Sequence, residues 1–310
     1  MKDVDFEVLD DVCGSEALWD EWRSTLAEEG WEIDDSTLAL LPNLSKNVIA
    51  RCRSDSRFIG SVLWTENDGL AYIGFYIIRK EYRGIKIGSA IWKRAMQRIP
   101  SPYIKGLRSV EYMIDRYKTM GFPVEAQPVV TQKIRVADFI EMTKSSGLSQ
   151  FDTKLVSSLK PTEFEAMLTY AKDVSGRDTS RLLRLHFDLA GVKGAILVDQ
   201  AGKIHGFASA TPVRTRNDVQ YKIAPVYAED NNGALSIIHS LLVEIQKEES
   251  EATAVVSTWN DSAGEQLRQL IGEKSIGTWT VYTLFSDINP NTMDFSRMFV
   301  AHGHMGHIDA

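Results

Sequence analysis

The seven residues from Arg83 to Ser89 constrain the fold most, because they join an apolar strand pattern directly to an amphipathic helix pattern. Residues 70–78 before them are rich in β-branched and aromatic side chains and have the length of a buried strand. After them, Ile87, Ile91 and Ala95 recur at helical spacing. A strand that turns into a helix through glycine presents backbone N–H groups and the positive end of the helix dipole to an anion. The pattern therefore predicts an anion site at this junction.

The glycines of this segment, Gly84 and Gly88, lie four positions apart. That spacing differs from the dinucleotide-binding fingerprint, and the second glycine is not followed by the lysine and hydroxyl residue of the Walker loop. Both common nucleotide motifs are therefore disfavoured. Arg83 and Lys86 add positive charge, so the segment is either an anion site or a strand-to-helix turn with solvated basic side chains.

Composition places the chain among globular proteins with two domains of ordinary size. It has 310 residues, of which 44% are hydrophobic and 25% charged. The two cysteines, Cys13 and Cys52, offer neither a disulfide framework nor paired metal ligands, which favours a reducing, cytoplasmic setting. The acidic N-terminus lacks a secretory core, and no apolar run is long enough to span a bilayer. A net charge of −7 disfavours nucleic-acid binding and favours a cationic substrate.

The order of predicted elements divides the chain into two mixed α/β units. After the helix that follows the Arg83 segment, a short strand is expected at 103–107 and a helix at 110–120. The polar segment 143–150 is the predicted linker. We therefore expect an N-terminal domain at 1–142 and a C-terminal domain at 151–310.

Several motifs, in their order along the chain, resemble those of a known family. They are Gly30-Trp31, the strand from Tyr72 to Arg79, the segment from Arg83 to Ser89, Ala90-Ile91-Trp92, and Tyr117 to Phe122. This set resembles the GNAT family of acetyl-CoA-dependent N-acetyltransferases, in particular the tandem type related to YitH and HolE, and the resemblance covers most of residues 25–135. It implies two tandem GNAT-like domains, each a twisted mixed sheet flanked by helices.

The resemblance implies acetyl-CoA as co-substrate and no metal. The pyrophosphate is expected on the backbone N–H groups of Arg83, Gly84, Ile85, Lys86, Ile87, Gly88 and Ser89. Pantetheine is expected along Ile77, Ile78 and Arg79, where the N–H near Ile78 would polarise the thioester carbonyl. Lys86 stands where the family usually has a glycine, so its side chain either holds a phosphate or crowds the approach to the backbone.

The corresponding junction of the second half, residues 224–233, carries Glu229 and Asp230 and no basic residue. Carboxylates at a helix N-terminus would satisfy its N–H groups and repel a pyrophosphate. Only the first domain is therefore expected to bind CoA, and the site of the second domain is expected to be degenerate.

Acetyl transfer to an amine needs an acid for the departing thiolate, and the resemblance places Tyr117 there; the alternative is a core tyrosine. No Asp or Glu occurs within residues 71–78, so the strand offers no carboxylate as a base. Tyr72, Gly74 and Tyr76 are expected on one strand face by alternation. Tyr76 could then hold a water chain that deprotonates the amine, unless the acceptor has a pKa low enough to need little help.

Trp31, Asp34 and Asp35 belong to the segment that lines the acceptor site in the resembled family, and Tyr72 is expected to contribute from the strand. An aromatic side chain among carboxylates suits an ammonium ion, whereas the alternative for such a charge run is a solvated face.

Three functions are compatible with these patterns. The first is an N-acetyltransferase that transfers acetyl directly to a small primary amine in a ternary complex. The second is a CoA-binding regulatory or interaction protein without catalysis, and the third is a phosphate-binding module unrelated to CoA. No nucleic-acid or membrane partner is expected, and no metal at His302, His304 and His307, because no acidic or cysteine ligand completes that group. The second domain is expected to close the substrate cleft, to form a homodimer interface, or to do both.

Overall fold

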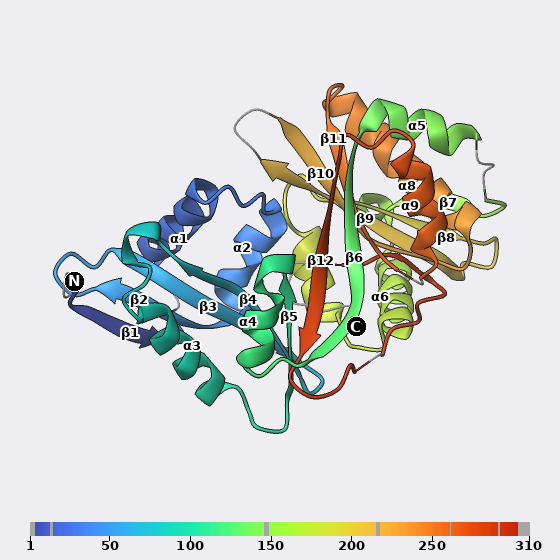
Figure 1. The fold of residues 1–310 in the computed structure, drawn as a ribbon. Helices are drawn as coiled ribbons and strands as arrows, with labels where there is room; N and C mark the ends of the chain where they lie inside the picture. Colours follow the sequence, from blue (N-terminus) through green and yellow to red (C-terminus); the bar gives the residue numbers. More distant parts are fainter. Residues whose placement is uncertain are drawn as a thin grey trace.

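The computed structural model describes residues 4–12, 15–145, 149–214, 218–260, 262–290 and 292–302. They form one continuous twisted sheet that runs through the whole molecule, with helices on both faces (Figure 1). Across the sheet the strands are β1 (Phe6–Asp10), β2 (Lys46–Cys52), β3 (Phe58–Asn67), β4 (Leu70–Ile78), β5 (Ile104–Ser109), β12 (Gly277–Phe285), β6 (Val124–Arg135), β11 (Thr253–Trp259), β10 (Val219–Ala228), β9 (Ile204–Arg214), β8 (Lys193–Val198) and β7 (Asp152–Leu155). The short strand β13 (Met298–Val300) pairs with β10 outside that order.

The two halves of the chain repeat one arrangement and share a sheet. Each half contributes one parallel pair, β4 with β5 in the first and β10 with β11 in the second. Strand β12, from near the end of the chain, lies between β5 and β6 and pairs antiparallel with both. A strand of the second half therefore completes the sheet of the first, and the mixed sheets expected for the two domains join into one.

Helices of the first half cover both faces of its strands. On one face, α1 (Glu16–Glu28) and α2 (Asp35–Leu44) pack against Phe58, Phe75 and Ile77. On the other face lies α3 (Ile87–Arg98), whose buried residues Ile87, Ile91, Trp92 and Ala95 match the apolar spacing of the sequence. The remaining elements of this half are η1 (Lys80–Tyr82), η2 (Glu111–Met113) and α4 (Ile114–Thr119).

The second half has the same layers. Its remaining elements are α5 (Val136–Ser145), η3 (Val156–Ser158), α6 (Pro161–Ser175), α7 (Ser180–Phe187), α8 (Asn231–Glu248) and α9 (Gly264–Gly272). Helices α5, α8 and α9 share one apolar core, and α6 packs into the core on the other face. Helix α5 extends into the first residues of the predicted linker 143–150, and residues 146–148 lie outside the described part. The boundary between the domains stays a prediction.

The mixed α/β class predicted from the sequence is confirmed. None of the described helices has the length and apolar character needed to cross a bilayer. Cys52 is buried, whereas Cys13, His304 and His307 fall outside the described residues.

Candidate functional site

A β-bulge in β4 shapes the strand that precedes the Arg83 segment. Gly74 pairs with Leu63 and Ile77 with Ser61, so two residues of β4 lie opposite one residue of β3. Phe75 takes a positive φ of 52° at this point. The extra residue interrupts the alternation of side chains between the two faces of the sheet.

The bulge separates two tyrosines that were expected on one face. Tyr72 packs with Phe285 on one side of the sheet. Tyr76 packs on the opposite side against α3, with its ring 5.1 Å from that of Trp92. The expectation that Tyr72, Gly74 and Tyr76 share a face is therefore wrong, because strict alternation fails across Phe75.

Strands β4 and β5 separate beyond the bulge. Their parallel pairing runs from Leu70 with Ile104 to Ile73 with Leu107 and then ends. The N–H of Arg79 donates to the carbonyl of Ile59 over 2.9 Å. Because backbone groups alternate in direction along an antiparallel ladder, the N–H of Ile78 points away from β3, toward the opening between β4 and β5. An unpaired strand edge thus leads to the Arg83 segment.

The loop from Arg83 to Ser89 enters α3 through two left-handed residues. Gly84 has a φ of 81° and Lys86 a φ of 67°, and α3 begins at Ile87. No side chain caps the N-terminus of α3. The N–H groups of its first turn, at Ile87 to Ser89, have no acceptor within the helix, and donors of this kind favour an anion.

The two basic residues of the loop have different surroundings. Arg83 Nε donates to the carbonyl of Ile78 over 2.8 Å, and Nη2 pairs with Glu29 over 2.8 Å. Arg83 therefore ties the loop to the end of β4 and to the end of α1. Lys86 is exposed, and its backbone takes the left-handed conformation that glycine favours.

Gly88 lies against the side chain of Tyr76. A Cβ at Gly88 would fall 2.6 Å from the Tyr76 hydroxyl and 3.3 Å from Ile78 Cγ1. Glycine lets the first turn of α3 approach β4 this closely. The backbone of the loop and the unpaired edge of β4 consequently form one continuous cradle.

Tyr117, on α4, lies close to the ring of Trp92. Its ring lies 5.8 Å from Trp92, the residue that also contacts Tyr76. Burial raises the pKa of Tyr117 to about 12, with a further contribution from Tyr76. Burial also raises the pKa of Tyr76. Both phenols therefore stay protonated at neutral pH.

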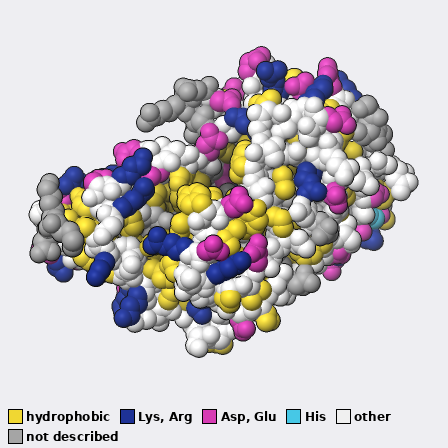
Figure 2. All heavy atoms as spheres, viewed as in Figure 1, with side chains coloured by type: hydrophobic (Ala, Val, Ile, Leu, Met, Phe, Trp, Pro, Cys, Tyr) yellow, Lys and Arg dark blue, Asp and Glu magenta, His cyan; other side chains and the backbone are white. Residues whose placement is uncertain are grey.

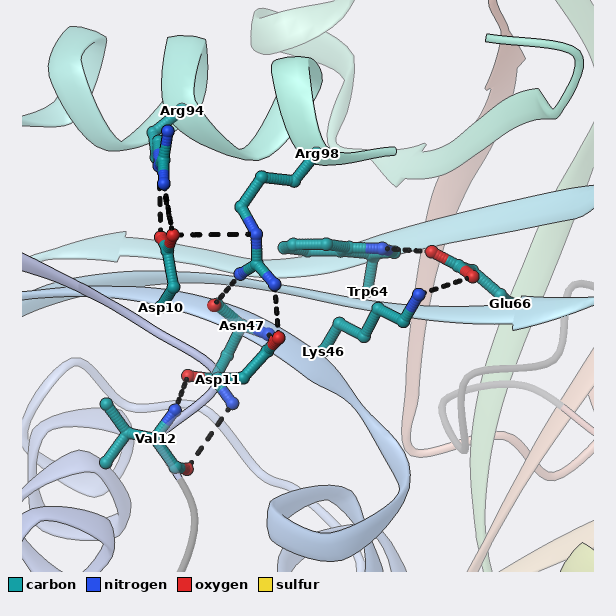
Figure 3. A network of polar contacts seen from close by, with 9 residues as sticks. All are labelled: Asp10, Asp11, Val12, Lys46, Asn47, Trp64, Glu66, Arg94 and Arg98. Carbon is teal, nitrogen blue, oxygen red and sulfur yellow. Dashed lines mark hydrogen bonds and ion pairs between the residues drawn. The ribbon is translucent and has the colours of Figure 1, made fainter. Parts of the chain in front are cut away.

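A polar network holds the outer side of α3 against the edge of the sheet (Figure 3). Arg94 pairs with Asp10 and Arg98 with Asp11, and Arg98 Nη1 donates to the carbonyl of Asn47 over 3.0 Å. These contacts, together with the apolar side of α3, fix the direction in which its N-terminus points.

Two carboxylates of the hairpin formed by β3 and β4 are engaged elsewhere. Glu66 accepts from Trp64 Nε1 over 2.9 Å and from Lys46 Nζ over 2.8 Å (Figure 3). Asp68 accepts from the N–H of Asp178 over 3.3 Å, across the contact between the halves. Neither is placed to act as a base.

The predicted acceptor residues lie on the α1 and α2 side of the sheet. Trp31 is 41% exposed and its ring lies 6.0 Å from that of Phe75. Asp34 is 2% exposed; it caps α2 by accepting from Thr37 N over 2.9 Å and pairs with Lys222 of β10 over 3.3 Å. Asp34 therefore links the two halves.

The other two predicted acceptor residues are less exposed than Trp31. Asp35 is the first residue of α2 and is half-buried, and Tyr72 is buried. Figure 2 shows hydrophobic side chains gathered where the two halves meet.

The junction of β10 and α8 in the second half differs from that of β4 and α3. Asp230 caps α8 by accepting from Gly233 N over 2.7 Å. Strand β13 pairs with β10 at Val226 and Tyr227, the part of β10 that follows its own register shift. Directly after β13, the N–H of Ala301 donates to the carbonyl of Ser257 on β11. A segment of the chain itself thus fills the opening between β10 and β11.

Arg108 escaped the sequence analysis, which ended its strand at Leu107. The structure extends β5 to Ser109 and buries Arg108 Nε and Nη2. The available signal was the charged Arg108 directly after Leu107, at the end of the predicted strand. Among the described residues, no group of histidine, cysteine and carboxylate side chains is placed to hold a metal.

Comparisons with known proteins match both halves. A family model described as the acetyltransferase (GNAT) family matches residues 15–122, and one described as an acetyltransferase (GNAT) domain matches residues 167–282. An uncharacterized protein of Caenorhabditis elegans, F36G3.2, is 32% identical over 315 residues, which span 100% of each chain.

Two solved structures share the fold. A tandem GNAT protein from the clavulanic acid biosynthesis pathway gives a TM-score of 0.64 at 11% identity, over 92% of this chain and 100% of that one. Saccharomyces cerevisiae N-myristoyltransferase with bound myristoyl-CoA gives 0.59 at 12% identity, over 96% of this chain and 88% of that one. With both halves matched, the chain belongs to the GNAT acetyltransferase family as a tandem N-acetyltransferase.

Proposed function

We propose that the first half transfers acetyl from acetyl-CoA directly to a small primary amine in a ternary complex. The uncapped N-terminus of α3, placed beside the unpaired end of β4, carries the proposal. Orphan N–H groups and a helix dipole favour a pyrophosphate, and an unpaired strand edge favours an extended amide chain such as pantetheine.

The residues present fit acetyl-CoA, which supplies an acetyl thioester when bound. The N–H groups of residues 83–89 would hold the pyrophosphate, and the edge at Ile77 and Ile78 would hold pantetheine. The side chain of Arg79 donates to Thr25 over 3.0 Å and so turns toward α1; only its backbone is proposed to line the groove. The exposed Lys86 adds charge beside the phosphates.

The N–H of Ile78 is proposed to polarise the thioester carbonyl, because it points into the opening between β4 and β5. Tyr117 is proposed to serve the leaving sulfur. A phenol with a pKa of about 12 holds its proton more tightly than a thiolate with a pKa of about 8.5 attracts it. Tyr117 therefore stabilises the thiolate by donating a hydrogen bond, and solvent completes the protonation.

The acceptor amine is proposed to enter from the α1 and α2 side, past Trp31, Asp35 and Tyr72. Tyr76 faces α3 and stays protonated, so we propose that it positions Tyr117 across Trp92 and takes no proton from the amine. The amine loses its proton to water, as suits an acceptor with a modest pKa. A cytoplasmic setting and a homodimer stay predictions.

The test combines binding with turnover. Calorimetric titration with acetyl-CoA should show binding to the wild-type protein and none to Gly88→Trp, because an indole at Gly88 would fill the cradle. A panel of amines, amino acids and peptides, followed by release of free thiol, should reveal at least one acceptor. Binding without thiol release from any of them would overturn the enzymatic proposal in favour of a CoA-binding regulatory protein, and absence of binding would overturn both.

A further inference from the structure

Arg108 of β5 is a half-buried cation that the proposed reaction leaves unused. Its Nε and Nη2 atoms are shielded from solvent and form no hydrogen bond within the described chain. Its guanidinium carbon lies 5.7 Å from the ring centre of Trp259. A cation–π contact offsets part of the cost of burying these atoms, but it leaves the N–H groups of Nε and Nη2 without acceptors.

Two further buried polar groups without partners adjoin Arg108. Thr283 stands directly opposite it in the ladder between β5 and β12, and Thr283 Oγ1 forms no hydrogen bond among the described residues. The Nε1 of Trp259, the ring that Arg108 contacts, forms none either. A buried donor without an acceptor costs about 1–3 kcal/mol. Unpartnered groups on Arg108 and on two residues that adjoin it point to a ligand that accepts hydrogen bonds.

The position of Arg108 connects it to the acceptor side of the first half. Leu107 packs into the core beneath α3, so by alternation Arg108 faces the opposite side of the sheet, the side of Tyr72. The last pair between β4 and β5 is Ile73 with Leu107, and Arg108 follows at the level of Gly74. Gly74 carries no side chain, and a Cβ there would meet only Tyr72, at 3.8 Å. The backbone of Arg108 therefore lies just beyond the point where β4 and β5 separate, and its guanidinium reaches across β12 toward Trp259 of β11, on the acceptor side of the sheet.

We propose that Arg108 binds a carboxylate of the acceptor, so that the acceptor class is an amine that also carries a carboxylate, such as an amino acid. Nε and Nη2 form one edge of the guanidinium, with two N–H groups that point in parallel. That edge matches the two oxygens of a carboxylate. One guanidinium balances one carboxylate charge, and Thr283 and Trp259 offer further donors.

This inference rests on the proposed acetyl transfer. It gives a role to an arginine on the acceptor side of a protein whose net charge is −7. The amine is held on the side of Trp31 and Asp35, and the carboxylate by Arg108. Arg108 is a specificity residue, because it selects the acceptor without contacting the thioester.

The test compares amino acids with their matched amides, in which a neutral carboxamide of similar size replaces the carboxylate. Acetyl transfer, measured as kcat/KM from thiol release, should favour the acid over the amide by about 10- to 100-fold, the range for a hydrogen-bonded charge. Arg108→Met should remove that preference by lowering the value for the acid while the value for the amide stays within about threefold. An active wild-type enzyme that prefers amides, or an Arg108→Met enzyme that keeps the preference for acids, would overturn the inference.

Arg184→Met is the matched control, because Arg184 is an exposed arginine of the second half that pairs with Glu165. It should leave the preference intact. Arg108→Lys retains the charge but loses the two parallel N–H groups of the guanidinium, so it should give a weaker preference for acids than the wild type. It replaces Arg108→Met in the test if Arg108→Met fails to fold.

A second readout separates this inference from the proposed activity. N-acetylamino acids, which need no turnover, should raise the unfolding temperature of the wild-type protein more than their amides do, and Arg108→Met should abolish the difference. If no amine releases thiol but this difference is observed, acetyl transfer fails while the carboxylate site stands. If thiol is released but the wild-type protein shows no difference, the carboxylate site fails alone.

Discussion

The hydroxyl of Tyr76 lies where a side chain at Gly88 would stand, since a Cβ built on Gly88 falls 2.6 Å from that oxygen. Tyr76 cannot swing away freely, because its ring packs on Trp92 at 5.1 Å. Gly88→Ala should therefore lower the free energy of unfolding by about 1–3 kcal/mol, the usual cost of overpacking. It should also weaken binding of acetyl-CoA. Urea unfolding and calorimetry measure the two effects.

Gly272→Ala provides the control for Gly88→Ala, because Gly272 is also helical and a Cβ there meets only Gln132 Nε2, at 3.4 Å. It should leave binding unchanged and raise stability by about 0.5–1 kcal/mol through helix propensity. Equal effects of the two substitutions would show that Gly88 is not constrained by Tyr76.

Lys86 provides a test of backbone strain that is separate from charge. With a φ of 67°, Lys86 holds a conformation that costs a non-glycine residue about 1 kcal/mol. Lys86→Gly should therefore be as stable as the wild type or more so, and Lys86→Ala should be less stable than Lys86→Gly. Both remove one charge, so both should weaken acetyl-CoA binding equally at low salt. If only Lys86→Ala lost affinity, the conformation of the loop and not the charge of lysine would hold the phosphates.

Tyr117 should show its role in turnover and not in binding. Tyr117→Phe should lower kcat by about 100-fold and leave the KM for acetyl-CoA within about threefold, because only the hydrogen bond to the leaving thiolate is lost. Since burial raises the pKa of Tyr117 to about 12, the phenol keeps its proton well above pH 10, and loss of this proton should not reduce the wild-type rate between pH 8 and pH 10. A fall in kcat over that interval that Tyr117→Phe abolishes would contradict this assignment.

The sequence predicted the local elements of the first half well, because their apolar spacing is regular. The strand at 70–78 and the helix from Ile87 are both present. The bulge at Phe75 was not predictable, because a single residue with positive φ leaves no trace in an apolar strand, and it moved Tyr76 to the other face. Asp34 shows a second limit, since its partner Lys222 lies far along the chain.

The shared sheet was beyond prediction for the same reason. Strand β12 reads as an ordinary strand of the second half, and nothing in its own residues indicates that it inserts between β5 and β6. Long-range pairing of this kind is decided by the assembled sheet and not by local propensity. The position of Arg108 beside Thr283 and Trp259 follows from that insertion, so the sequence alone could not bring these groups together.

His186 of α7 should make the protein sensitive to acid. It bridges Ser36 of α2 over 2.8 Å and Ser209 of β9 over 3.1 Å, and thus joins the halves. Burial lowers the pKa of His186 to about 4, so the ring is neutral in the folded protein. The unfolded chain takes up a proton near pH 6.5 and the folded chain does not. Stability present above pH 6.5 is therefore lost as the pH falls toward 4.

The groups around His186 act in opposite directions. Asp34 raises its pKa and Lys222 lowers it, and the ring of His302 lies 6.0 Å away. Between pH 7.5 and pH 4.5 the wild type should lose about 2–3 kcal/mol more stability in urea than His186→Gln, which cannot titrate. Parallel losses in the two proteins would show that other groups cause the acid sensitivity.

Acetyl-CoA should bind once per chain. In the second half, Asp230 accepts from Gly233 N at the start of α8, and β13 pairs with β10 where pantetheine would need an unpaired edge. Asp230→Ala should lower stability by about 1 kcal/mol through loss of the cap and should create no second site, because β13 still fills the opening. Calorimetry should give a stoichiometry of one for the wild type and for Asp230→Ala, and none for Gly88→Trp. Residual binding by Gly88→Trp would place a CoA site in the second half and contradict the role assigned to β13.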